Sequence, residues 1–193
     1  MEEFVLEEIK EKSVGIQPKI LARLHEVYLS KTIGQADEYI ADFDRIRHAG
    51  PDDLVKIYIN SPGGDLLTAL QFMRTISETE ATVIASVEGM CASAATLILL
   101  AAHSYEISPH SLFLLHNYSE GTYGKGNEIF AHITHSRKWS QALLSECYQD
   151  FLTKDEIRDL LDDRDIWLTS EEVIERLKVR NDLIKERNKN PAT

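Results

Sequence analysis

Short apolar runs alternate along the chain with stretches whose apolar residues recur at helical spacing. The runs predict strands at 26–29, 55–59, 81–87, 104–107 and 111–115. The periodic stretches predict helices over 36–49, from Asp65, from Ser93, over 127–152, over 155–161 and from a capping pattern at Thr169. Strands that alternate with helices are typical of βαβ units. The predicted fold class is therefore α/β with a mostly parallel sheet.

Two details of this pattern carry specific expectations. The helix from Asp65 is expected to pack through an apolar stripe, and Gly89 is expected to break the strand at 81–87 before a tight turn of small residues. The members of the predicted stripe are Leu66, Leu67, Leu70, Met73 and Ile76.

The organisation along the chain is that of one domain between two less structured ends. Residues 1–25 form an N-terminal segment with a short helix at 20–24, and residues 26–184 form the domain. A terminal strand is expected over 179–184, followed by a disordered tail over 185–193.

The helix over 127–152 is longer than the domain needs. At about 1.5 Å per residue it would reach nearly 40 Å. A helix that projects in this way implies a partner surface, and another copy of the chain is the expected partner.

Charge and composition exclude several classes. The formal net charge is −11, which disfavours a nucleic-acid partner. The longest apolar run, 92–102, is too short to cross a bilayer, and the acidic start of the chain does not resemble a signal peptide. The two cysteines, Cys91 and Cys147, form no metal or disulfide pattern, so we expect a reducing, cytoplasmic setting with no metal and no cofactor.

Polar residues follow three of the predicted strands. Gly64, Ser93 and His116 stand where sites gather in parallel sheets, at the carboxyl ends of strands. By itself Ser93 could be an ordinary helix cap. With a histidine base and an aspartate from 162–165 it could instead perform acyl transfer, the hydroxyl attacking a carbonyl while backbone N–H groups stabilise the oxyanion.

Four motifs occur together in one order and spacing: 59–64 (INSPGG), 89–94 (GMCASA), 114–117 (LLHN) and 163–168 (DRDIWL). In these motifs the chain resembles the proteolytic subunits of the Clp protease, the ClpP family with its ClpP/crotonase-like fold, over about residues 26–183. The resemblance implies a serine endopeptidase. It implies that Ser93 is the nucleophile, His116 the general base and then acid, and Asp165 the orienting carboxylate. The backbone N–H groups of Gly64 and Ala94 would form the oxyanion hole.

The resemblance also implies an assembly. Residues 118–152 look like the family's handle, a strand and helix that interlock opposing rings into a double-ring homo-oligomer, a tetradecamer, with the serines inside. The implied partner is a ring-shaped AAA+ unfoldase ATPase, and the implied substrates are peptides and unfolded proteins, with no nucleic acid and no membrane. This chain shows no phosphate-binding loop of its own.

Several positions depart from the family pattern. Ala94 and Ala95 replace the usual Met-Gly after the serine, and Asn117-Tyr118 replaces the usual Gln-Pro after the histidine. Lys56 stands where an aromatic residue of the ATPase docking cleft is usual, whereas Tyr58 fits the pattern. These departures favour a divergent homologue, of the kind that a bacteriophage could carry.

Two other functions stay open from the residues alone. A crotonase-type acyl-CoA enzyme shares the fold class and also polarises a carbonyl with two backbone N–H groups, and a non-catalytic scaffold subunit could retain the fold. Two further chemistries are weaker. His132 and His135 with Glu128 could face a metal, but a solvated helix face explains them better, and Cys91 is expected to pack against the sheet.

Overall fold

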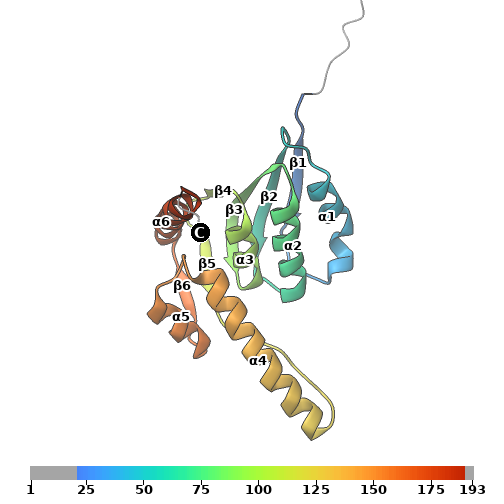
Figure 1. Cartoon of the computed structure of the whole chain (residues 1–193), viewed down its shortest axis with the longest axis vertical. Coiled ribbons are helices and arrows are strands. Elements are labelled where there is room, and N and C mark those ends of the chain that lie inside the picture. The colour runs from blue at the N-terminus through green and yellow to red at the C-terminus, as the bar shows by residue number, and fades with distance from the viewer. Residues whose placement is uncertain (1–20, 190–193) are drawn as a thin grey trace, which may run out of the picture.

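A mixed, mostly parallel sheet forms the centre of the protein (Figure 1). The structure, a computed structural model, describes residues 21–189. Its strands are β1 (Leu24–Leu29), β2 (Leu54–Ser61), β3 (Thr82–Ala92), β4 (Ser104–Ile107), β5 (Leu112–Leu115) and β6 (Ile166–Leu168). The strand order is β1-β2-β3-β5-β6, with β4 paired to β3. The α/β fold expected from the sequence is confirmed.

Residues 1–20, which include the start of the helix expected at 20–24, lie outside the described part. Residues 21–23 are not helical, and Leu24 begins β1.

Strand β3 is the strand that the rest of the sheet is built around. Its first half pairs in parallel with β4 and its last three residues pair in parallel with β5. The expected break at Gly89 is wrong, because the strand continues through it to Ala92. The side chain of Asn60 bridges the irregularity between β2 and β3, accepting a hydrogen bond from the N–H of Met90 at 3.0 Å. A Cβ on residue 89 would lie 2.6 Å from Asn60 Oδ1, so the glycine makes room for this contact.

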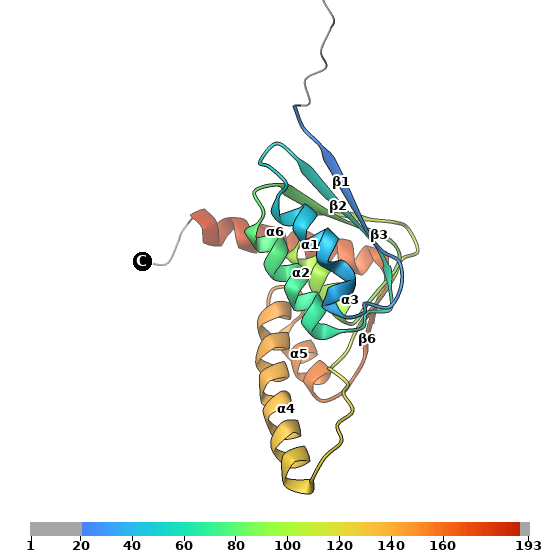
Figure 2. The ribbon, with the colours of Figure 1, turned by 90° about the vertical axis from the view of Figure 1, so that its right-hand side faces the viewer.

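Helices cover the sheet and extend beyond it. They are the 3₁₀ turn η1 (Ala36–Tyr39), α1 (Ile40–Arg47), α2 (Leu66–Glu78), α3 (Ala94–Ala101), α4 (Gly126–Tyr148), α5 (Lys154–Leu161) and α6 (Ser170–Lys189). Figure 2 shows α1, α2 and α3 together on one face of the sheet, while α6 contacts β5. Of the helices within 21–189, none combines the length and the apolar content that crossing a bilayer requires.

Helix α3 is buried along nearly its whole length. Leu97 and Leu99 are 1% exposed and Ile98 is fully buried. Burial of one such side chain contributes about 1.5–3 kcal/mol. This helix is therefore anchored firmly between the sheet and its neighbours, and it fixes the turn that precedes it.

Helix α2 packs through only part of the stripe that the sequence predicts. Ala69, Phe72 and Ile76 are buried, whereas Leu67 is 66% exposed. Of the predicted stripe, Ile76 is fully buried, and Leu66 and Met73 are partly buried against the core. Leu66 and Leu67 also line a cavity.

Helix α4 projects from the sheet, and residues 118–125 run outward beside it (Figure 1). It ends at Tyr148, four residues before the predicted end, because the chain turns there: the N–H groups of Phe151 and Leu152 both donate to the carbonyl of Tyr148. Phe151 and Leu152 are buried below this turn.

The C-terminal part is helical where a strand was expected. The strand predicted over 179–184 is wrong, since α6 runs without interruption to Lys189, which also makes residues 185–189 helical. The helix starts as the sequence predicts, because the Thr169 hydroxyl accepts a hydrogen bond from the N–H of Glu172 and the Glu172 carboxylate accepts one from the N–H of Thr169.

A partly buried ion pair joins α5 to α6. Both terminal nitrogens of Arg176 donate to the Glu156 carboxylate, at 2.9 and 2.7 Å. The Arg176 hydrogen bonds lower the pKa of Glu156 to about 2. The pair closes the segment that contains β6, so it also supports the position of the residues just before β6.

We expect Glu156→Gln to lower the free energy of unfolding by about 2 kcal/mol at neutral pH, after allowance for solvent screening. Because the folded-state pKa is depressed, the ionised carboxylate stabilises the fold above its ordinary pKa of 4.5 and loses this effect as the pH falls towards 2. Urea unfolding at one fixed protein concentration should therefore show a difference from wild type that shrinks between those pH values. The control is Asp155→Asn, which removes an exposed partner of Arg158. An equal effect of both substitutions would contradict the assignment.

Candidate active site

Ser93 occupies a strained turn between β3 and α3. Its backbone has φ 53° and ψ −128°, a left-handed conformation that costs a non-glycine residue about 1–3 kcal/mol. The N–H of Ser93 donates to the carbonyl of Leu114 at 2.8 Å, which ties the turn to β5. The half-buried side chain therefore leaves the sheet at its carboxyl edge, immediately before a rigid helix.

The loop of Gly63 and Gly64 lies against this turn. Gly63 has φ +91°, and a Cβ there would lie 2.6 Å from both the carbonyl oxygen of Ala92 and the Cβ of Ser93. Gly64 has φ +147°, and a Cβ there would lie 2.2 Å from the carbonyl oxygen of Ile33. Two backbone hydrogen bonds join the loop to Ile33: the N–H of Ile33 donates to the carbonyl of Gly63 at 2.8 Å, and the N–H of Asp65 donates to the carbonyl of Ile33 at 2.9 Å. The N–H of Gly63 also donates to Ser61 Oγ at 3.2 Å.

Strand register carries His116 and Asp165 to the same edge of the sheet. In the antiparallel pair of β5 and β6, Leu115 lies opposite Ile166, and one more step of this register sets His116 opposite Asp165. In the parallel pair of β3 and β5, Ala92 lies beside Leu114, so Ser93 follows at the end where His116 stands. Within residues 21–189, no hydrogen bond joins Ser93 to His116 or His116 to Asp165. Catalytic hydrogen bonds are often loose before substrate binds.

Asn117 connects the end of β5 to the turn before β6. Its side-chain amide donates to Asp163 Oδ1 at 2.8 Å and to the carbonyl of Leu161 at 3.4 Å. Asp163 has φ 62°, so this turn, like the turn of Ser93, contains a left-handed residue. Asn117, which stands where the family usually has glutamine, thus has a local role. It stabilises the turn that leads into Asp165.

A cavity of about 520 Å³ opens at this edge of the sheet, and Gly64, Ser93, Ala94 and His116 line it. Asp165 does not line the cavity and is exposed. The remaining walls come from α2, α3, α4 and the segment before α4, and they include Leu66, Leu67, Leu97, Tyr118, His132, Trp139, Leu144 and Tyr148. The structure therefore places four of the five predicted site residues around one cavity, and the fifth, Asp165, stands opposite His116 one register step beyond the pair of Leu115 and Ile166.

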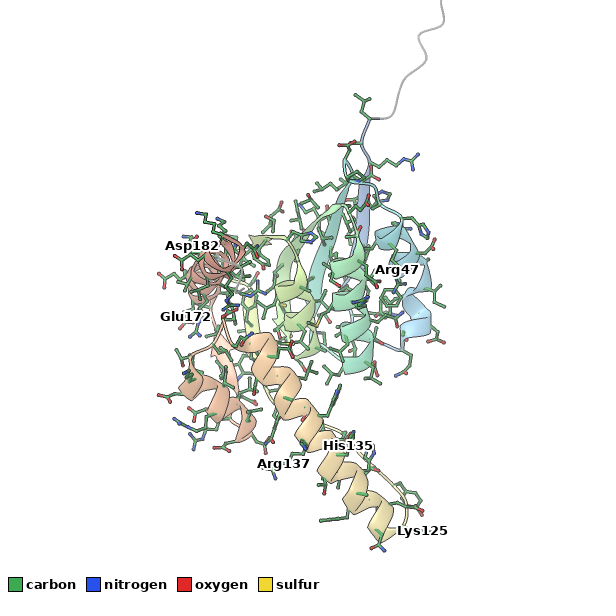
Figure 3. All side chains as sticks on the ribbon, viewed as in Figure 1. Arg47, Lys125, His135, Arg137, Glu172 and Asp182 are labelled. Atoms are coloured by element: carbon green, nitrogen blue, oxygen red, sulfur yellow. The ribbon has the colours of Figure 1, made fainter. Side chains whose placement is uncertain are left out.

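The alternative nucleophile and the possible metal face are both poorly placed. Cys91 is fully buried within β3, and burial raises the pKa of its thiol, so a reactive thiolate is disfavoured. His132 Nε2 lies 3.4 Å from Glu120 Oε2, and His135 lies along the projecting helix (Figure 3). Among the residues that the structure describes, no group of three or more His, Cys, Asp or Glu side chains is arranged to hold a metal ion.

Two residues at this site escape the sequence analysis. Thr96 and Tyr148 are buried next to the turn of Ser93 and share a hydrogen bond. Thr96 is the single polar residue of an otherwise apolar helix, which is the one signal in the sequence. Nothing in the sequence pairs it with Tyr148, 52 residues away.

The fold and this site define an α/β protein with a serine on a strained strand-to-helix turn beside a cavity. The family description "Clp protease" matches residues 11–176, and the chain belongs to this family. The chain is 33% identical over 124 residues to the ATP-dependent Clp protease proteolytic subunit 2 of Treponema denticola, which is 63% of this chain and 62% of that protein.

Two Bacteroides proteins, each named ATP-dependent Clp protease proteolytic subunit, are also similar. The Bacteroides fragilis protein is 29% identical over 137 residues, 70% of this chain and 66% of its own length. The Bacteroides thetaiotaomicron protein is 28% identical over 158 residues, 78% of this chain and 72% of its own length. The chain spans just under two thirds of the length of the Treponema and Bacteroides fragilis relatives.

We expect Gly63→Ala to distort the turn of Ser93, because the new methyl group would overlap the Ser93 side chain and the φ of +91° disfavours alanine. A loss of stability of about 2 kcal/mol or more and slower modification of Ser93 by a fluorophosphonate should follow. The matched control is Gly121→Ala, where a Cβ meets nothing within 4 Å. Normal labelling of the Gly63 variant would show that the loop does not set the turn.

Proposed function

We propose that this protein is a serine endopeptidase, the proteolytic subunit of a self-compartmentalised protease that hydrolyses peptides and unfolded proteins. The observation that carries the proposal is the convergence of three strand ends. The ends of β3 and β5 and the start of β6 bring Ser93, His116 and Asp165 to one edge of the sheet, beside a cavity of about 520 Å³.

The chemistry assigned to these groups is acyl transfer. The neutral imidazole of His116 takes the proton of the Ser93 hydroxyl as the oxygen attacks the scissile carbonyl. Collapse of the tetrahedral intermediate breaks the C–N bond, and the imidazolium returns its proton to the leaving amine. A water molecule, deprotonated by His116, then attacks the acyl ester and restores the serine. Asp165 holds the imidazole in the productive tautomer and stabilises its cation.

Two backbone N–H groups can receive the oxyanion. Ala94 is the first residue of α3, where an N–H group has no intrahelical partner. The hydrogen bonds that join the glycine loop to Ile33 use the carbonyl of Gly63 and the N–H of Asp65, and they leave the N–H of Gly64 for a ligand. Each such donor contributes about 2.7–4 kcal/mol to transition-state stabilisation in comparable sites.

Assembly belongs to the same proposal. Helix α4 exposes Phe130 (74%) and Ile133 (45%) on the part that projects from the sheet. A second copy of the chain, packed through α4 into a double ring, would bury these side chains and enclose the serines. The similar Treponema and Bacteroides proteins are named as subunits of ATP-dependent proteases, and from these names we infer an AAA+ unfoldase as the partner that delivers unfolded protein.

The first test is covalent. A fluorophosphonate should modify wild-type protein at Ser93, and Ser93→Ala should abolish both labelling and hydrolysis of a small fluorogenic peptide while leaving assembly intact. Ser77→Ala, an exposed serine on α2, is the control and should behave as wild type. Residual peptide hydrolysis by the Ser93 variant would rule out the nucleophile. Acyl-CoA binding without labelling would favour a crotonase-type enzyme.

The catalytic effect of Asp165, the third member of the triad, can be distinguished from that of the neighbouring aspartates in the same turn. We expect Asp165→Asn to lower kcat by about 10²–10⁴-fold, because the imidazole loses its orienting charge. Asp162→Asn, a change at an exposed neighbour in the turn, should lower it less than twofold. Comparable losses in both variants would indicate a damaged turn rather than a lost catalytic carboxylate.

The assembly can be tested by mass. Wild-type protein should form a large homo-oligomer by light scattering or native mass spectrometry, and Phe130→Glu combined with Ile133→Glu should dissociate it by placing charges in an apolar contact. Val179→Glu, on an exposed face of α6, serves as the control. A wild-type monomer across pH and salt would contradict the proposed chamber, as would rapid digestion of a stably folded protein without an ATPase.

A further inference from the structure

A buried chain of three polar groups ends on the backbone of Ser93. The Thr96 hydroxyl lies 2.7 Å from the Ser93 carbonyl oxygen, and the Tyr148 hydroxyl lies 2.6 Å from Thr96 Oγ1. The N–H of Thr96 donates to the same carbonyl at 2.9 Å. Thr96 is 3% exposed and Tyr148 is 2% exposed, so water does not compete for these contacts.

The donor-to-acceptor direction of these hydrogen bonds follows from the number of hydroxyl protons available. Thr96 has one hydroxyl proton, and the Ser93 carbonyl can only accept, so Thr96 donates to Ser93 and Tyr148 donates to Thr96. Burial raises the pKa of the Tyr148 phenol, which keeps it protonated and able to donate. The order from donor to acceptor is therefore Tyr148, Thr96 and the carbonyl of Ser93.

The acceptor of this chain and the proposed oxyanion donor belong to one peptide group. The carbonyl of Ser93 and the N–H of Ala94 share a rigid, trans peptide plane, and they point in opposite directions from it. Two hydrogen bonds to the carbonyl, from the N–H and the hydroxyl of Thr96, therefore also fix the direction of the Ala94 N–H. Ala94 lines the cavity, so this direction matters for a ligand there.

We propose that Thr96 and Tyr148 are positioning residues that preorganise the oxyanion hole, by holding the peptide between Ser93 and Ala94 so that its N–H faces the cavity. The inference rests on the proposed peptidase function. It assigns a role to the base of α4, because Tyr148 is the last residue of that helix and reaches across to the start of α3. A preorganised donor stabilises developing charge without reorganisation at the moment of reaction.

A purely structural role predicts something different. Buried hydroxyl groups need partners in any fold, and their loss lowers stability without regard to chemistry. Loss of positioning should instead lower kcat and the rate of phosphonylation at Ser93, because both reactions place negative oxygen in the hole. It should leave KM nearly unchanged, because the neutral carbonyl of the bound substrate forms a weaker hydrogen bond to this donor than the oxyanion does.

The test uses the assembled full-length protein with Thr96→Val, Tyr148→Phe, their double variant and the conservative Thr96→Ser. We expect Thr96→Val to lower kcat and the labelling rate about tenfold, with KM within about twofold. Tyr148→Phe should lower both by about threefold, less than Thr96→Val, because the direct Thr96 bonds remain. The double variant should have the same rates as Thr96→Val, since Tyr148 acts only through the Thr96 hydroxyl. Thr96→Ser keeps a hydroxyl and should retain the wild-type rates.

The control is Thr75→Val on α2, which removes another buried threonine hydroxyl that donates to a backbone carbonyl. It should lower the melting temperature without changing kcat. The inference is overturned if Thr96→Val and Tyr148→Phe lower the melting temperature but leave the labelling rate unchanged, or if their effects multiply in the double variant. If Thr96→Val does not fold, Tyr148→Phe, which removes a single oxygen, tests the inference through kcat and the labelling rate. Failure of the wild-type protein to label or to cleave peptide would instead refute the proposed function.

Discussion

The burial of α3 against the sheet is the interaction on which the site depends. Leu97, Ile98 and Leu99 are excluded from water, and together they contribute several kcal/mol to the fold. This exceeds the cost of about 1–3 kcal/mol for the left-handed backbone of Ser93 just before the helix. The strained turn can therefore persist, and Gly63, whose missing side chain leaves room for Ser93, completes its surroundings.

The same burial explains why the site is assembled from distant parts of the chain. The carboxyl end of β3 is fixed by α3, and β5 is fixed to it through the bond from Ser93 to Leu114. Asn117 then joins the end of β5 to the turn before β6, while the pair of Glu156 and Arg176 joins the helices on either side of β6. Each connection is local, yet together they set the edge where Ser93, His116 and Asp165 meet.

Much of this arrangement could be predicted from the sequence because periodicity reports burial. The runs at 55–59 and 81–87 are β-branched and apolar, and both are strands. The pattern fails where a contact from elsewhere decides. Asn60 lets β3 continue through Gly89, and within the helical segment 179–184 of α6 Arg180 donates to the distant Tyr105 hydroxyl at 2.7 Å.

For the site, the rule that parallel strands end together predicted Gly64, Ser93 and His116 as neighbours, and all three line the cavity. Asp165 was assigned only by resemblance, because its position depends on the antiparallel pairing of β6, a three-residue strand that no period could reveal. The sequence pattern places Leu67 in the core, but its side chain is 66% exposed and lines the cavity instead. The sequence alone does not distinguish an apolar side chain that packs in the core from one that lines a ligand cavity.

The most direct test of the central claim is the structure of the assembled protein after reaction with a fluorophosphonate. The account predicts phosphorus bonded to Ser93 Oγ, with the phosphoryl oxygen about 3 Å from the backbone nitrogens of Gly64 and Ala94. The His116 imidazole should lie within hydrogen-bond reach of Ser93 Oγ and of Asp165. An adduct on another residue, or a phosphoryl oxygen turned away from both nitrogens, would contradict it.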